Sequence, residues 1–204
     1  LNNDPVISLM IDVMVKIQET ISQVYPATLS IDENERLMNA ALREMDLSQP
    51  CYSDANSTMR MSFGTIESYT MSNGQNSGIY CGPEGLLKKA NTRDKNLDYQ
   101  LLPGIRTLLE QADFGRYRDK RSKDLQLCFL SNNDITGGNS GSPVFNNKGK
   151  LIGLAFDGNW EALSSDIAFN RQLQRCISVD IRYVLYMMDK WGNAQHLLDE
   201  LCFH

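Results

Sequence analysis

The fold is decided by Gly138-Asn139-Ser140-Gly141-Ser142-Pro143, in which one serine stands between glycines and an apolar segment follows the proline. Glycine lets the chain turn sharply and lets a substrate carbonyl approach the backbone. Such a turn holds a serine hydroxyl outward and directs two amide N–H groups toward one point, where an oxyanion can form. The stretch therefore predicts Ser140 as a nucleophile, with the backbone N–H groups of Gly138 and Ser140 as its oxyanion hole. A plain Gly/Ser/Asn turn in a hairpin is the alternative, because Gly-x-Ser-x-Gly alone is a weak motif.

A serine hydroxyl becomes a good nucleophile only when a base takes its proton, and that base is usually a histidine held by an acid. The chain holds two histidines, His196 and His204, and both follow Ser140. Chymotrypsin-like peptidases, whose nucleophile turn this stretch resembles, carry their histidine and aspartate before the serine. We therefore expect the base and the acid to lie outside this chain, and the chain to be the C-terminal piece of a longer enzyme.

The composition narrows the class of protein. The chain has 204 residues, of which 42% are hydrophobic, and a formal net charge of −5. This length suffices for one core, or for one core with a helical annex. Because no basic stripe stands out, nucleic acid is not expected as a partner. Charges interrupt every apolar stretch well before the ~20 residues of a membrane span.

The five cysteines give no sign of a zinc site, and no cofactor is expected. Their spacing is wide and irregular and contains no Cys-x-x-Cys, so it does not predict a zinc site. The sequence leaves their pairing open, and the odd count leaves at least one thiol free. The cysteines are Cys51, Cys81, Cys128, Cys176 and Cys202.

The first 50 residues are patterned as helices. Apolar residues at helical spacing predict one helix over residues 4–24, which Pro26 would end, and a second over about 32–45. We expect these two helices to form an antiparallel pair.

After Pro50 the pattern changes to short strands separated by Gly/Asn turns, which is typical of a barrel. Alternating residues predict a first strand over 58–66. Further strands are predicted at 125–130, 141–145, 151–156 and 174–177. Helices are predicted at 85–90, 101–112, 178–190 (with Ser178 as N-cap) and 194–201. The alternation of Ile177, Val179, Ile181 and Tyr183 fits a strand equally well, so the start of the helix at 178–190 stays open.

Four stretches carry a specific resemblance: Asp54–Arg60, Asp134–Pro143, Gly153–Glu161 and Ser178–Val184. In order and over nearly the whole chain, they resemble the C-terminal part of the bacterial dipeptidyl-peptidase 7 and 11 family of serine peptidases. That family has a double chymotrypsin-like β-barrel with a helical domain inserted between the barrels. The resemblance implies a mainly β fold with helices: residues 1–48 would end the helical domain, and residues 49–204 would form the second barrel with C-terminal helices.

The resemblance also implies an activity, the release of dipeptides from oligopeptides with a free N-terminus. Ser140 would be the nucleophile, while the histidine and the aspartate would lie in a first barrel that is absent here. The missing N-terminal barrel and the rest of the helical domain are thus expected partners of this chain. The longer enzyme of which this chain would be a part, called the parent below, is expected to be a homodimer. It is expected in the periplasm, secreted or at the cell surface. This chain alone is expected to be inactive.

The strand ending at Phe156 would flank the cleft and pair with the substrate backbone. By resemblance, the Asp157 carboxylate would bind the free ammonium group of the substrate, although a turn aspartate is the plainer interpretation. Gly158 would leave room for an apolar or aromatic side chain before the cut. Members that cut after acidic residues have an arginine there, so Gly158→Arg would shift the preference toward acidic residues.

Asp134 supports a competing interpretation. It stands six residues before Ser140, where trypsin-like enzymes carry the acid that selects arginine and lysine. The alternatives are therefore a trypsin-like endopeptidase and a non-catalytic fragment that only binds peptide. By resemblance we take Asp134 as structural.

Overall fold

The computed structural model describes residues 4–45, 58–92, 99–165 and 169–203, with only the backbone for 25–30. The chain divides into two compact units, Leu1–Asp54 and Ala55–His204. His204 and Cys51 lie outside the described residues.

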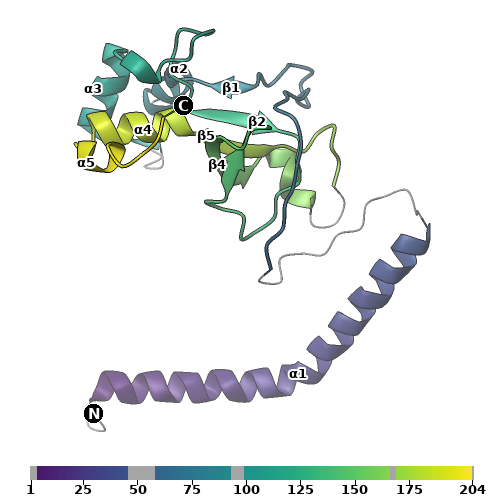
Figure 1. Cartoon of the computed structure of the whole chain (residues 1–204). Coiled ribbons are helices and arrows are strands. Elements are labelled where there is room, and N and C mark those ends of the chain that lie inside the picture. Colours follow the sequence, from purple (N-terminus) through teal and green to yellow (C-terminus); the bar gives the residue numbers. More distant parts are fainter. Residues whose placement is uncertain (1–3, 46–57, 93–98, 166–168, 204) are drawn as a thin grey trace. The chain divides into compact units, whose positions relative to one another are not determined.

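The described residues of the first unit form a single helix, α1 (Pro5–Met45, 41 residues), so the predicted antiparallel helix pair is wrong. Asp4 caps it by accepting a hydrogen bond from the backbone N–H of Val6 at 2.8 Å. Pro26 does not end the helix, because a missing N–H removes one hydrogen bond and bends a helix without necessarily stopping it. Figure 1 shows α1 bent near its middle. The apolar stripe of α1, which includes Met10, Met14 and Ile17, is largely exposed.

The second unit contains a five-stranded antiparallel sheet in the order β1-β2-β5-β4-β3. The strands are β1 (Tyr80–Cys81), β2 (Cys128–Ser131), β3 (Pro143–Phe145), β4 (Leu151–Gly158) and β5 (Cys176–Asp180). Four of the predicted strands are confirmed with shifted ends, and β1 was not predicted. Among the described residues the sheet is open between β1 and β3, so a closed barrel is not observed.

The strand predicted at 58–66 is wrong for the residues described, which contribute only an isolated bridge between Ile66 and Ser131. The alternating apolar side chains are exposed, with Met59, Met61 and Phe63 at 99%, 85% and 80%. The alternation therefore does not reflect one buried face, which is the condition under which it predicts a strand.

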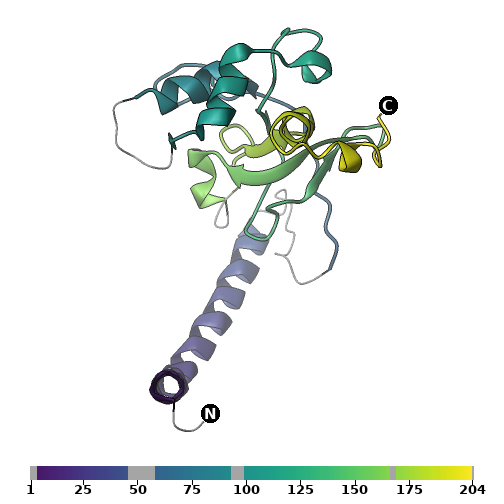
Figure 2. The same ribbon diagram turned by 90° about the vertical axis from the view of Figure 1, so that its left-hand side faces the viewer.

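In the described residues this unit also contains α-helices and 3₁₀ turns, and Figure 1 shows the α-helices grouped at one side of the sheet. They are α2 (Pro83–Ala90), α3 (Pro103–Gln111), η2 (Gly115–Tyr117), η3 (Trp160–Ser164), α4 (Ile181–Lys190) and α5 (Gln195–Leu198). In Figure 2, α4 is seen nearly along its axis beside the strands. Its N-cap is Asp180, which accepts a hydrogen bond from the Arg182 N–H. The predicted N-cap, Ser178, is a fully buried residue of β5, because the strand alternation continues two residues further.

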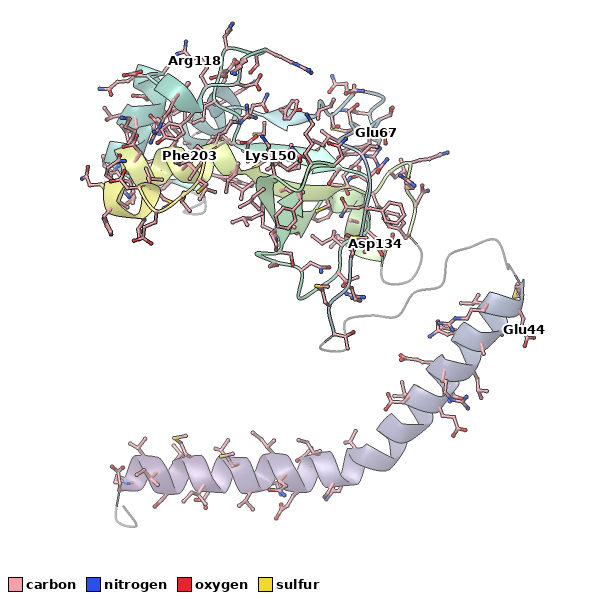
Figure 3. The ribbon with its side chains drawn as sticks, viewed as in Figure 1. Glu44, Glu67, Arg118, Asp134, Lys150 and Phe203 are labelled. Carbon is pink, nitrogen blue, oxygen red and sulfur yellow. The ribbon has the colours of Figure 1, made fainter. Side chains whose placement is uncertain are left out.

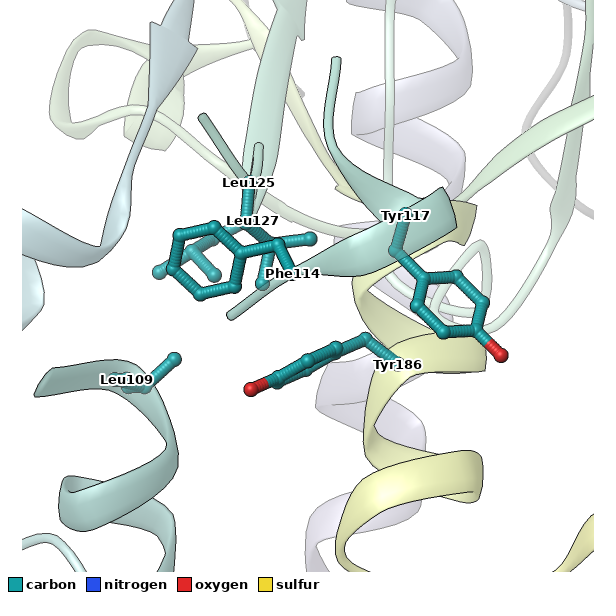
Figure 4. Packing of buried hydrophobic residues seen from close by; sticks show 6 residues of the cluster. All are labelled: Leu109, Phe114, Tyr117, Leu125, Leu127 and Tyr186. Carbon is teal, nitrogen blue, oxygen red and sulfur yellow. The ribbon is translucent and has the colours of Figure 1, made fainter. Parts of the chain in front are cut away.

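The core lies between these helices and the segment that enters β2 (Figure 4). The Tyr186 ring of α4 lies at its centre and meets Phe114 and Tyr117 edge to face, with ring centroids 5.6 Å and 5.9 Å apart. Leu109 of α3 and Leu125 are buried against the same cluster. This packing anchors the start of β2 and the end of β5, and so fixes the middle of the sheet.

A cluster of charged side chains centred on Arg182 stabilises the junction between β5 and α4. The Arg182 guanidinium donates to both carboxylate oxygens of Asp180, to Asp119 at 2.6 Å and to Gln126 at 2.7 Å. The backbone N–H of Ser122 and the Arg182 guanidinium hold the pKa of the Asp119 carboxyl well below its usual range. Asp119 therefore stabilises the fold fully above the ordinary carboxyl pKa of about 4, and this contribution is lost as the pH falls below it.

We expect Arg182→Met to lower the free energy of unfolding by about 2–4 kcal/mol, because it leaves partly buried Asp180 and Asp119 without their cation. Urea unfolding at pH 7 followed by circular dichroism measures this loss. Arg121→Met is the control, since Arg121 is exposed on the same loop. The stability difference between wild type and Arg182→Met should shrink below about pH 4. If Arg182→Met lowers the free energy of unfolding no more than Arg121→Met does, Arg182 does not stabilise the fold through Asp180 and Asp119.

Candidate active site

Ser140 lies on a turn between β2 and β3 whose shape depends on glycine. Gly138 and Gly141 have φ angles of 95° and 86°, in the region that side chains other than glycine rarely adopt. No atom lies within 4 Å of the position that a Cβ atom would take at either residue. Glycine is therefore required here for its backbone conformation and not for close packing.

Hydrogen bonds tie this turn to its neighbours. The Asn139 side-chain oxygen accepts from the Thr136 N–H at 2.9 Å, and the Ser142 N–H donates to the Asn139 carbonyl at 2.9 Å. On the other side, the Gly141 N–H donates to the Ala155 carbonyl of β4 at 2.7 Å, and the Ala155 N–H donates back to Ser142 at 2.9 Å. The turn that carries Ser140 is thus stabilised internally through Asn139 and is attached to β4 through Gly141 and Ser142.

Two N–H groups of the turn remain available. The amides of Asn139, Gly141 and Ser142 donate hydrogen bonds, whereas those of Gly138 and Ser140 donate none within the part of the chain that the structure describes. These are the two donors that the sequence predicted for an oxyanion hole. The two N–H groups flank Asn139. An incoming acceptor could bind them while the hydrogen bonds that hold the turn stay intact.

The Ser140 hydroxyl is exposed and donates to the Phe156 carbonyl oxygen at 3.3 Å. A carbonyl oxygen orients a hydroxyl but does not remove its proton. His196 lies exposed on α5, and within the described residues no hydrogen bond joins it to Ser140. The structure therefore brings Ser140 and Phe156 together and provides no base beside them among the residues it describes.

The C-terminal end of β4 pairs with β5 but extends beyond the last residue that pairs with β3. The pairing with β3 stops at Leu154, which faces Pro143, while the pairing with β5 continues through Asp157 and Gly158 after an irregularity at Phe156. Asp157 is exposed, and its carboxylate accepts a hydrogen bond from the Gly158 N–H at 2.8 Å. A short stretch of strand edge is thus open next to Ser140, with an exposed carboxylate beside it.

Gly158 does not face empty space, contrary to the expectation from sequence. A Cβ atom there would lie 2.8 Å from the Cβ of Ala162 in η3 and 3.9 Å from Cγ2 of Ile135. A contact of 2.8 Å is below what real Cβ atoms show, so a side chain at 158 requires η3 to move. Gly158→Arg would therefore disturb η3 before its guanidinium reached any substrate.

Ala162 and Ile135 are the site residues that sequence reasoning missed. Both are ordinary apolar residues, and no motif distinguishes them; only the fold brings the loop before Ser140 and η3 to the same point. Asp134, the acid that favours a trypsin-like interpretation, lies on that loop (Figure 3). It is half-buried, and its carboxylate accepts a hydrogen bond from the Ile135 N–H at 2.9 Å.

Comparison with known proteins identifies the family. The model of the Peptidase S46 family matches residues 2–203. The chain belongs to the Peptidase S46 family. Among its S46 relatives, the Dipeptidyl-peptidase 7 of Porphyromonas endodontalis is 47% identical over 98% of this chain and 24% of the relative. The Asp/Glu-specific dipeptidyl-peptidase of Porphyromonas gingivalis is 37% identical over 98% of this chain and 28% of that protein.

A solved S46 relative confirms the fold. The crystal structure of Porphyromonas endodontalis DPP11 in complex with substrate superposes with a TM-score of 0.69 and 37% identity, covering 79% of this chain and 23% of that one. The antiparallel sheet with its helices is therefore similar to the corresponding part of that structure. The chain spans about a quarter of the length of the relatives it matches.

Within the described ranges, no three histidine, cysteine or acidic side chains gather as they would around a metal ion. None of the described helices combines the length and the apolar character that crossing a membrane requires. Cys81, Cys128, Cys176 and Cys202 are free thiols.

Proposed function

We propose that this chain is the C-terminal part of a serine dipeptidyl-peptidase and that Ser140 is its nucleophile. The observation that supports the proposal is the Ser140 turn itself: an exposed hydroxyl lies on a bend shaped by glycine, and two N–H groups of this bend have no acceptor among the described residues. The names of the relatives supply the reaction class, since they are dipeptidyl-peptidases.

In the proposed mechanism the Ser140 oxygen attacks the carbonyl carbon of the second substrate residue. The oxygen of that carbonyl becomes negatively charged, and the N–H groups of Gly138 and Ser140 stabilise it. The peptide bond to the third residue then breaks, its nitrogen takes the proton from the base, and the rest of the peptide leaves as an amine. The dipeptide remains on Ser140 as an ester until water, which gives its proton to the base, attacks the same carbon and releases the dipeptide acid and the serine hydroxyl. The base that takes the Ser140 proton, and the acid that orients this base, come from parts of the parent outside this chain, so the chain alone is inactive.

The open end of β4 would hold the substrate as an additional strand. The Phe156 carbonyl, which accepts from Ser140 in the free chain, would then accept a backbone N–H of the substrate. The exposed Asp157 carboxylate at this edge would bind the substrate ammonium group through a charge-assisted hydrogen bond. A free N-terminus held there limits cleavage to the second peptide bond.

We further propose that the residue before the cut is apolar or aromatic. No cation lies next to Gly158 among the atoms nearest to it, which come from Ala162, Ile135 and a backbone carbonyl. The identity is 47% to a Dipeptidyl-peptidase 7 and 37% to an Asp/Glu-specific relative, which argues against a preference for acidic residues.

We also propose a domain organisation for the full-length parent. Residues 1–48 would end a helical domain, and residues 49–204 would complete a chymotrypsin-like second barrel. We expect a homodimer located in the periplasm, secreted or at the cell surface.

Peptides with free and blocked N-termini test the reaction class. We expect the full-length parent to release dipeptides from a free oligopeptide and to cut its acetylated form at least about 100-fold more slowly, because acetylation removes the charge that Asp157 binds. Mass spectrometry of the products measures both. Equal cleavage of the two forms after arginine or lysine would instead establish the endopeptidase with Asp134 as its selecting acid. Binding without cleavage would establish the peptide-binding fragment.

A further inference from the structure

The loop that leads to Ser140 is closed by a pair of hydrogen bonds between Thr136 and Asn139. The Asn139 side-chain oxygen accepts from the Thr136 N–H at 2.9 Å, and the Asn139 N–H donates to the Thr136 carbonyl at 3.2 Å. Both bonds span Gly137 and Gly138, which are exposed and have no atom within 4 Å of an ideal Cβ position. Because packing does not hold these two glycines, and glycine has the largest conformational freedom of all residues, their conformation depends on the bonds between Thr136 and Asn139.

The two donors of the proposed oxyanion hole are therefore supported differently. On the side of Ser140, the residues Gly141 and Ser142 are bonded to β4 through the backbone of Ala155. On the other side, the Gly138 N–H belongs to the loop that the Asn139 side chain closes. Since a displacement of about 1 Å at a reacting centre can cost about 100-fold in rate, a loosened loop would weaken the Gly138 donor.

Arg60 extends this support from a distant segment. Its Nη2 atom donates to the Thr136 hydroxyl at 3.3 Å, and the same hydroxyl lies 3.5 Å from the Asn139 side-chain oxygen. A hydroxyl can accept from a guanidinium and donate its own proton to a carbonyl oxygen, so the three side chains form a row of hydrogen bonds that ends at Asn139. Arg60 is half-buried, whereas its neighbours Met59 and Met61 are almost fully exposed. Of these three side chains, Arg60 is the one that faces the loop.

We propose that the Asn139 side chain, supported by Thr136 and Arg60, positions the Gly138 N–H for the substrate oxyanion. This inference rests on the proposed function. Asn139 is a positioning residue, since it acts through the backbone of Gly138. The oxyanion forms only on the way to the tetrahedral intermediate, so the effect falls on kcat and not on KM.

The test compares Asn139→Ala, Asn139→Asp and Asn146→Ala in the full-length parent. Asn146 is the matched control, because its side chain closes the turn between β3 and β4 in the same way, accepting from the Lys148 and Lys150 N–H groups at 2.9 Å and 3.1 Å. We expect Asn139→Ala to lower kcat about 10- to 100-fold and to leave KM within about 3-fold. Asn139→Asp keeps an acceptor oxygen and should retain kcat within about 5-fold. Asn146→Ala should leave both constants within about 3-fold of wild type.

A second measurement uses a dipeptide boronic acid, whose tetrahedral adduct with a serine resembles the transition state. In Asn139→Ala its affinity should fall by the same factor as kcat/KM, while the affinity for the released dipeptide stays at the wild-type value. A role in folding alone would lower both affinities or neither.

The outcomes separate this inference from the function on which it rests. If Asn139→Ala behaves like Asn146→Ala, or if Asn139→Asp loses as much as Asn139→Ala, the positioning role is refuted while the peptidase stands. If the wild-type parent releases no dipeptide, both fail. Should circular dichroism show that Asn139→Ala does not fold, Thr136→Val decides, because it removes only the hydroxyl between Arg60 and Asn139. A fall in kcat of about 3- to 10-fold at unchanged KM then supports the role, and a wild-type kcat refutes it.

Discussion

Replacing Ser140 by alanine should lower kcat/KM of the full-length parent by about 10⁴- to 10⁶-fold, the usual cost of removing a serine nucleophile. The physical reason is that no other group can form the ester, while the oxyanion donors and the strand edge still bind the substrate. The residual rate and an unchanged KM would reflect those remaining contacts. Steady-state kinetics with a fluorogenic dipeptide substrate measures both constants.

Ser142→Ala is the matched control for this experiment. Ser142 belongs to the same turn, and it contributes backbone hydrogen bonds to Asn139 and Ala155 that alanine retains. Its activity should stay within about 3-fold of wild type, since a change of one hydroxyl away from the reacting atoms costs well under 1.4 kcal/mol, the equivalent of tenfold. If Ser140→Ala and Ser142→Ala behave alike, Ser140 is not the nucleophile.

Asp157→Asn should lower kcat/KM by about 10- to 100-fold, mainly through KM. It removes a charge-assisted hydrogen bond worth about 1.5–3 kcal/mol and keeps the shape of the side chain. The Asp157 carboxylate contacts only the Gly158 N–H in the described chain, so its charge is available to a substrate. Asp113→Asn, at another exposed aspartate, serves as control.

The pH profile gives this experiment a second measurement. An N-terminal ammonium group has a pKa of about 8, so wild-type kcat/KM should fall as the substrate amine loses its proton above that pH. The fall should be much weaker for Asp157→Asn, because a neutral amide distinguishes little between amine and ammonium. An identical pH profile for both enzymes would show that Asp157 does not bind the ammonium group.

The elements that the sequence predicted well are those whose signals are local. β4 was predicted because turn residues bound its apolar run. The Ser140 turn was predicted because closely spaced glycines indicate a turn. The helix predicted at 4–24 was right in type and wrong in length. A proline removes one hydrogen bond, and whether a helix bends or stops there depends on the residues that follow.

The parts that could not be predicted depend on contacts between distant segments. The exposed alternation at Met59, Met61 and Phe63 looks like a strand until its burial is known. The role of Phe156 in orienting Ser140 is carried by a backbone carbonyl, which any residue has. Ala162 meets Gly158 only because Asn159 starts a tight turn that folds back on the strand. None of these relations leaves a pattern in the sequence.

The most direct test of the central claim is to treat the full-length parent with a fluorophosphonate, which bonds only to an activated serine, and to locate the adduct by peptide mass spectrometry. The account predicts one adduct per chain, on Ser140, and weak or no labelling of the present 204-residue chain, because the proposed base lies outside it. An adduct on another serine, or none on an active parent, would contradict it.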